Sequence, residues 1–324
     1  MEQKNLVLAI ALSFAILLGW NLWEQSKLEE IADQAGTQQP AGSGEPGSAP
    51  APGAAPAPAN AVPGSQAAAL APLRDIASVL ADSPRVKVTS PRLSGSINLR
   101  GARFDDLTLI KYRETIEPDS ENVVLLRPAG AHNPYYADFG WWLGEKVQKP
   151  EKNTLWTADG DTLSPDNPVT LSWTNDIGVT FQQTYTIDEN YMFSVTQKVT
   201  NASGRDIAAA PYGLISRTGT PEILGYYILH EGMIGVFEGE LQETDYEDLQ
   251  NAPAEKRATT GGWLGITDKY WLTSLVPDQT MAVKTNFLSN ASGNDFRYQA
   301  DYIGPTTAVA DGASYEVKSH FFAG

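Results

Sequence analysis

The chain contains no cysteine among its 324 residues. Disulfides, thiolate-bound zinc and thiol catalysis are therefore excluded. Histidine is also scarce, because only His132, His230 and His320 are present and they form neither an H-x-x-x-H nor an H-E-x-x-H pattern. No G-x-S-x-G elbow or P-loop occurs. We expect no catalytic residue, no metal site and no bound cofactor.

Positively charged residues are fewer than negatively charged ones. Lys and Arg number 23 against 39 Asp and Glu, for a net charge of −16. Phosphate groups would be repelled, so a nucleic-acid partner is not expected. Six acidic residues gather between Glu238 and Asp248. They suit either a solvated strand and loop face or a site for cations or a basic partner.

Long apolar runs are rare, and only Leu6 to Trp23 has the length of a membrane span. Eighteen helical residues cover about 27 Å, close to the thickness of a bilayer's hydrocarbon core. Trp20 and Trp23 fall where indole rings prefer the membrane interface. We therefore expect residues 1–5 in the cytoplasm, a transmembrane helix over residues 6–23 and the rest outside. A cleaved signal peptide is the alternative, although no small-residue cleavage site follows.

Residues 24–84 are expected to form a linker. From Gly36 to Pro72 the sequence is mostly Ala, Pro, Gly, Ser and Gln, a composition that favours extended, solvated backbone and builds no core. Leu73 to Ala81 has apolar residues at helical spacing, which indicates one short helix or a continuation of the linker.

Residues 85–324 show a different pattern, in which polar and apolar side chains alternate over short runs such as Val169 to Trp173. Turn sequences such as Asn175 to Gly178 separate these runs. Many short strands joined by turns indicate a mainly β, antiparallel sandwich. At about 240 residues, one large two-sheet sandwich fits best.

The segment from Gly261 to Pro277 is unusually aromatic. Trp263, Tyr270 and Trp271 stand there among apolar neighbours. The segment suits either a strand pair in the core or an exposed contact surface for a partner, and these three residues are the candidates for partner contact.

Two other groups of polar residues are candidate sites. His230 and Glu231 are adjacent in the sequence. They could form an acid/base pair, or His230 could be a hydrogen-bonded loop residue. Asp159, Asp161 and Asp166 suggest calcium, but their spacing fails the EF-hand pattern because Gly160 separates the first two and no glutamate follows at the twelfth position.

The whole chain resembles the N-terminal part of a YidC-type membrane protein insertase of the YidC/Oxa/Alb family, from a Gram-negative bacterium. The matching residues are Met1 to Leu6, the helix ending at Gly19 to Gln25, the Ala/Pro linker and the block Gly262 to Trp271, which continues to Pro277. Tyr315 to Gly324 is similar to the strand that leads towards the family's second transmembrane helix.

The resemblance implies a β-supersandwich related to sugar mutarotases, located in the periplasm and anchored in the inner membrane. It also implies a protein that inserts, folds and assembles inner-membrane proteins, with or without the Sec translocon, and uses no cofactor. Its partners would be SecYEG, SecDF, nascent inner-membrane proteins and membrane lipid. The family's insertion groove and its charged residue belong to later helices, which we expect beyond Gly324.

Two other functions stay open at this point. A membrane-anchored carbohydrate-binding or mutarotase-like protein would need histidine and glutamate to converge in a cleft. An envelope scaffold without any link to insertion would need no such site. Fold alone does not decide among these functions.

Overall fold

The strands follow the alternation of side chains along the sequence. In β9 (Val179–Ile187) and β10 (Met192–Asn201) every second residue is buried. The two strands pair antiparallel, with Val195 opposite Tyr185. Because successive side chains of a strand point to opposite faces, this pattern directs one face of each strand into a core.

The computed structural model describes residues 62, 73–117, 119–144, 147–221, 229–293 and 295–324. All of these belong to the unit Ala57–Gly324, and the other unit is Met1–Pro56. The expected membrane helix over residues 6–23, with Trp20 and Trp23, lies outside the described residues. Among the described helices, none has the length and apolar character needed to cross a bilayer.

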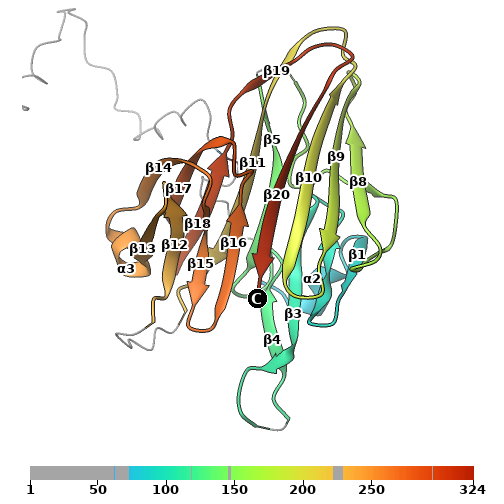
Figure 1. Cartoon of the computed structure of the whole chain (residues 1–324). Coiled ribbons are helices and arrows are strands. Elements are labelled where there is room, and N and C mark those ends of the chain that lie inside the picture. Colours follow the sequence, from blue (N-terminus) through green and yellow to red (C-terminus); the bar gives the residue numbers. More distant parts are fainter. Residues whose placement is uncertain (1–61, 63–72, 118, 145–146, 222–228, 294) are drawn as a thin grey trace, which may run out of the picture. The chain divides into compact units, whose positions relative to one another are not determined.

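Two large sheets make up the described part of the chain (Figure 1). The first sheet has eleven strands: β1 (Arg85–Thr89), β2 (Leu93–Asn98), β3 (Arg103–Arg113), β4 (Asn122–Leu126), β5 (Tyr135–Leu143), β7 (Thr162–Leu163), β11 (Ile207–Thr218), β14 (Ala254–Thr260), β17 (Ala282–Ser292), β18 (Asp295–Ile303) and β19 (Thr307–Val309). Their main order is β14-β17-β18-β11-β5-β3-β2-β1-β7, while β4 pairs with β3 and β19 with β11.

The second sheet has nine strands in the order β13-β12-β15-β16-β20-β10-β9-β8-β6. Besides β9 and β10 they are β6 (Thr157–Ala158), β8 (Val169–Thr174), β12 (Gly232–Phe237), β13 (Glu240–Asp245), β15 (Trp263–Asp268), β16 (Trp271–Val276) and β20 (Ser314–Ala323). The predicted mainly β sandwich is confirmed. Among the named strands of the described residues, β1 and β7 are the one pair that runs parallel.

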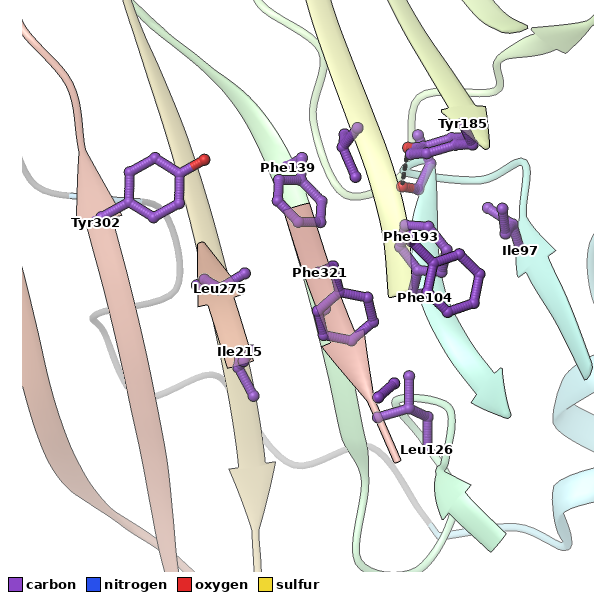
Figure 2. Packing of buried hydrophobic residues seen from close by; sticks show 14 of the residues in the cluster. Ile97, Phe104, Leu126, Phe139, Tyr185, Phe193, Ile215, Leu275, Tyr302 and Phe321 are labelled. Atoms are coloured by element: carbon purple, nitrogen blue, oxygen red, sulfur yellow. Dashed lines mark hydrogen bonds between the residues drawn. The ribbon is translucent and has the colours of Figure 1, made fainter. Parts of the chain in front are cut away.

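Buried side chains from both sheets form one hydrophobic core. Its centre is aromatic, and Figure 2 shows Phe104, Phe139, Tyr185, Phe193 and Phe321 side by side. The ring of Phe104 lies 4.9 Å from that of Tyr185 and 5.1 Å from that of Phe193, centroid to centroid. Such edge-to-face pairs add to the stabilisation that burial of the rings provides.

The turn between β8 and β9 shows how polar sequence signals end the strands. The side-chain oxygen of Asn175 accepts hydrogen bonds from the amides of Ile177 and Val179. Gly178 has a φ of 87°, a conformation that side chains disfavour. The Asn-Asp-Ile-Gly sequence therefore supplies both the local hydrogen bonds and the backbone freedom that the reversal requires.

The two described helices are short: one precedes β1 and the other lies between β13 and β14. Helix α2 (Ile76–Leu80) falls inside the Leu73 to Ala81 stretch, and the side chain of Asp75 caps its N-terminus by accepting from the amide of Ser78. Helix α3 (Tyr246–Asn251) follows β13 and buries Tyr246 and Leu249.

Candidate functional site

The aromatic segment from Gly261 to Pro277 folds into the hairpin of β15 and β16. Leu264 pairs with Leu275 and Ile266 with Thr273, and all four are buried in the sandwich. The segment is thus a strand pair of the nine-stranded sheet. The turn of the hairpin, at Lys269 and Tyr270, lies beyond the paired residues of the two strands.

The structure separates the three candidate contact residues. Tyr270 stands at the turn with 68% of its surface exposed, while Trp271 next to it is half-buried against the core. Trp263 begins β15 at the far end of the hairpin. Because Leu264 and Ile266 face the core, alternation places Trp263 on the opposite face of the sheet. Trp263 therefore does not share a surface with Tyr270 and Trp271.

A third aromatic residue joins the hairpin turn from the other sheet. Tyr112 of β3 packs edge-on against Trp271, with ring centroids 5.0 Å apart, and remains 43% exposed. The ring of Tyr270 lies 6.4 Å from that of Trp271. We call Tyr112, Tyr270 and Trp271 the aromatic end of the sandwich.

The aromatic end has a cation and further apolar surface beside it. The ammonium of Lys269 lies 4.8 Å above the ring of Tyr270. Figure 1 shows the β3–β4 hairpin protruding from the same end of the sandwich. Ile116 in this hairpin is fully exposed. Exposed aromatic and aliphatic side chains gathered at one end are typical of a surface that meets another molecule.

An ion pair between the two sheets anchors the hairpin turn. The guanidinium of Arg217 on β11 pairs with the carboxylate of Asp268 at the end of β15. The hydroxyl of Tyr246 donates to the same carboxylate at 3.1 Å. Arg217 also lies 5.1 Å from the centre of the Tyr135 ring, whose hydroxyl is hydrogen-bonded to Thr273.

The charges of this anchor are fixed by their surroundings. Burial alone would lower the pKa of Arg217, but its neighbours Tyr246 and Asp268 raise that pKa above its ordinary value. Burial raises the pKa of Tyr135 and of Tyr246 well above the ordinary tyrosine value. Arg217 therefore stays charged and both phenols stay neutral at physiological pH, so the ion pair with Asp268 is present there.

The histidines lie on separate elements. A ring nitrogen of His230 lies 2.8 Å from the carbonyl oxygen of Met233, and the carboxylate of Glu231 accepts from the amide of Lys269 at 3.2 Å. His230 thus contacts the backbone of its own segment and, at 3.2 Å, the carboxylate of Asp245, while Glu231 binds the backbone of the β15–β16 turn. His320 on β20 contacts Ser194 at 3.1 Å, and His132 precedes β5.

Metal ligands do not gather in the part of the chain that the structure describes, since no group of three candidate side chains is close enough to hold an ion. Asp159 instead accepts from the amide of Thr170 at 2.7 Å. The acidic residues from Glu238 to Asp248 are exposed at the β12–β13 turn, on β13, which is an edge strand, and on α3. Charged side chains on an edge strand oppose pairing with another chain.

Sequence reasoning missed Tyr112 and the ion pair of Arg217 with Asp268. Tyr112 is far from Trp271 along the sequence, and only the packing of β3 beside the end of β16 brings them together. Alternation along β3 predicts a strand but carries no information about its neighbours in the other sheet.

Three comparisons relate this geometry to known proteins. Residues 85–324 match the family described as the YidC periplasmic domain. The chain is 40% identical over 335 aligned positions to the membrane protein insertase YidC of Bradyrhizobium diazoefficiens, covering all of this chain and 54% of that protein. It is 44% identical to that of Nitrobacter hamburgensis, covering all of this chain and 52% of the relative.

Among solved structures, a galactose mutarotase related enzyme from Lactobacillus acidophilus superposes with a TM-score of 0.53. The match covers 74% of this chain and 97% of the enzyme at 10% sequence identity. This likeness shows a shared β-sandwich fold and nothing about activity. The chain spans about half the length of the curated relatives it matches. The sequence matches show that the chain belongs to the YidC family, with residues 85–324 as its periplasmic domain.

Proposed function

We propose that the chain is the N-terminal portion of a membrane protein insertase that inserts, folds and assembles proteins of the bacterial inner membrane. Its residues 6–23 would anchor it, and its sandwich would stand in the periplasm. Family membership over the whole chain supports this proposal, because the relatives are named as membrane protein insertases. The observation that carries the role of the sandwich is the aromatic end.

The sandwich would act by binding and not by catalysis. Tyrosine and tryptophan contribute large contact areas at protein interfaces and often dominate the binding energy. At the aromatic end, Tyr270 presents its ring to solvent above a turn that the ion pair of Arg217 and Asp268 holds in place. A rigid, exposed ring loses little conformational freedom when a partner covers it.

The partners would be SecDF and SecYEG, together with nascent inner-membrane proteins. Membrane lipid would contact the anchor with Trp20 and Trp23 at its interface. The acidic sandwich, in a chain with a net charge of −16, would be repelled by anionic lipid headgroups. We therefore assign the aromatic end to a protein partner, and SecDF is the one we would test first.

The experiment replaces Tyr270 with Ala in the full-length insertase of cells that contain no other copy. We expect recovery of SecDF with the purified insertase to fall about tenfold or more, because loss of a central interface tyrosine costs about 2 kcal/mol. Tyr270→Phe keeps the ring and should retain most of the binding. Leu241→Ala is the matched control, since Leu241 is 55% exposed on β13, away from the aromatic end.

Unchanged recovery of SecDF with Tyr270→Ala would remove the aromatic end from this role. The carbohydrate alternative makes a different prediction, because a mutarotase-like protein should turn over sugars. Saturable epimerisation by the purified chain would contradict the proposal that the sandwich acts by binding alone.

A further inference from the structure

A second apolar cluster lies outside the core. It consists of Val62, Ala210, Tyr212, Leu214 and Ile303, and the half-buried side chains of Tyr136 and Trp142 pack against it. Ala209 and Ile215 of β11 belong to the core between the sheets. Because side chains alternate along β11, the cluster occupies the opposite, outward face of the eleven-stranded sheet.

Three neighbouring strands build a hollow on this face. Tyr212 of β11 is paired with Gly140 of β5 on one side and with Ile303 of β18 on the other. A Cβ atom on Gly140 would lie 2.5 Å from the hydroxyl of Tyr212, so the missing side chain leaves room for the tyrosine ring. Two register positions along the same strand pair, the small Ala210 stands opposite the large Trp142.

We call the hollow formed by Ala210, Tyr212, Leu214 and Ile303, with Tyr136 and Trp142 beside it, the Val62 seat. Val62 fills it and is only 3% exposed. Yet Val62 belongs to the Ala/Pro/Gly-rich stretch, in which we expected no core residue. Between Gly36 and Pro72 it is one of two large aliphatic residues, the other being Leu70.

Valine is suited to this role. Its branched side chain has few rotamers to lose on burial. Pro63 follows it in the sequence, and a residue before proline favours extended backbone, which projects its side chain clear of its neighbours. The neighbours Ala61 and Pro63 offer no larger aliphatic side chain that would compete with it.

We propose that the Val62 seat is a docking site for the chain's own linker, so that the linker is fastened to the outward face of the sandwich at Val62. The eleven Cα-to-Cα steps from Val62 to Leu73 can span at most about 40 Å, which keeps Val62 close to the sheet. Such a short connection raises the local concentration of Val62 at the seat to the millimolar range, which lowers the entropic cost of docking its side chain.

The docking has a consequence that rests on the proposed function. With Val62 fastened, the first attachment of the chain to the sandwich is at residue 62 and not at residue 73. The linker then leaves the sandwich from the outward face of the eleven-stranded sheet. The seat itself is covered and becomes available to another apolar segment only when Val62 leaves it.

The absence of cysteine provides a direct test. A single cysteine is introduced in place of Val62 in the full chain, in detergent, and its rate of reaction with a maleimide is measured. Cysteine is small and apolar enough to enter the seat. Ala57→Cys and Ala67→Cys, in the same linker, are the matched controls. We expect the thiol at position 62 to react about tenfold more slowly than the controls.

A second variant tests the seat from its other side. Ala210→Trp, combined with Val62→Cys, fills the hollow and should restore the fast rate. A thiol at position 62 that reacts as fast as the controls would overturn the proposal. Protection that disappears on dilution would place Val62 in the seat of a second copy and would equally overturn the intramolecular docking. Neither result depends on binding of SecDF, so the proposed function is tested separately.

Discussion

At the scale of single residues, Asp301 of β18 is a buried acid that the fold accommodates through hydrogen bonds. Its carboxylate accepts from the side-chain amides of Asn286 and Gln299, both at 2.7 Å. Burial nevertheless outweighs these bonds and raises the pKa of Asp301 to about 6. The folded state therefore holds a proton on Asp301 at a pH where the unfolded chain has released it.

The consequence is a pH-dependent loss of stability. The pKa of Asp301 in the unfolded chain is near 3.9, so between about pH 4 and 6 the folded state binds more protons than the unfolded state. Its contribution to the free energy of unfolding falls as pH rises through this window and is roughly 3 kcal/mol lower above it. Asp301→Asn should flatten this part of the profile, measured by urea unfolding at pH 4.5 and pH 7.

Asp176→Asn, at an exposed turn residue, is the control and should leave the profile as it is. A slope between pH 4 and 6 that survives Asp301→Asn would show that another group causes it. Sequence alone could not identify Asp301, since an aspartate in an alternating strand is expected to face solvent. In the folded structure it is fully buried between Leu214 of β11 and Asn286 of β17.

At the scale of elements, the β15–β16 hairpin combines a predictable part with an unpredictable one. Its strand pair follows from the alternation of Leu264 and Ile266 with Thr267 and Gly265. The position of its turn depends on Arg217, which belongs to the other sheet. Tyr246, from helix α3, completes the hydrogen bonding of Asp268. No local pattern joins these three segments.

We predict that Arg217→Met lowers the free energy of unfolding by about 3 kcal/mol, because it leaves the carboxylate of Asp268 partly buried without its partner charge. The double variant Arg217→Met with Asp268→Leu should recover most of this loss, since two apolar side chains replace the ion pair. Chemical denaturation of the single and double variants measures both effects. Equal losses in the two variants would mean that the pair itself contributes little.

The acidic edge strand of the nine-stranded sheet is a second feature at the scale of elements. β13 ends the nine-stranded sheet and carries Glu240, Glu243 and Asp245 with their side chains exposed. The interpretation of the acidic stretch as a solvated face is consistent with this exposure. Negative charge at an open edge discourages pairing with a second sandwich.

At the scale of the molecule, the aromatic core unites the two sheets. Phe104 of β3 belongs to the eleven-stranded sheet, yet its ring packs against Phe193 and Phe321 of the nine-stranded sheet (Figure 2). The described sandwich therefore cannot lose one sheet without exposing the core face of the other. We expect both sheets to unfold together.

Phe104→Ala should lower the free energy of unfolding by about 3–5 kcal/mol, because it leaves a cavity at the centre of the core. Fluorescence of Trp141 and Trp173, from the two different sheets, should report a single unfolding transition. In Phe104→Ala its midpoint should move by the same amount for both reporters. Ile110→Ala, at a partly exposed position of the same strand, should shift it far less. Two separate transitions would show that the sheets are independent.

The sequence by itself determined the class of structure, because the alternation of polar and apolar residues decides which face of each strand is buried. It also determined the family, through the order of apolar run, linker and the block from Gly262 to Trp271. Only the tertiary structure decided the neighbours across the sandwich: Tyr112 beside Trp271, Arg217 beside Asp268, and Val62 in its seat. These contacts join residues far apart in the chain, and their energies depend on packing and burial that no local pattern encodes.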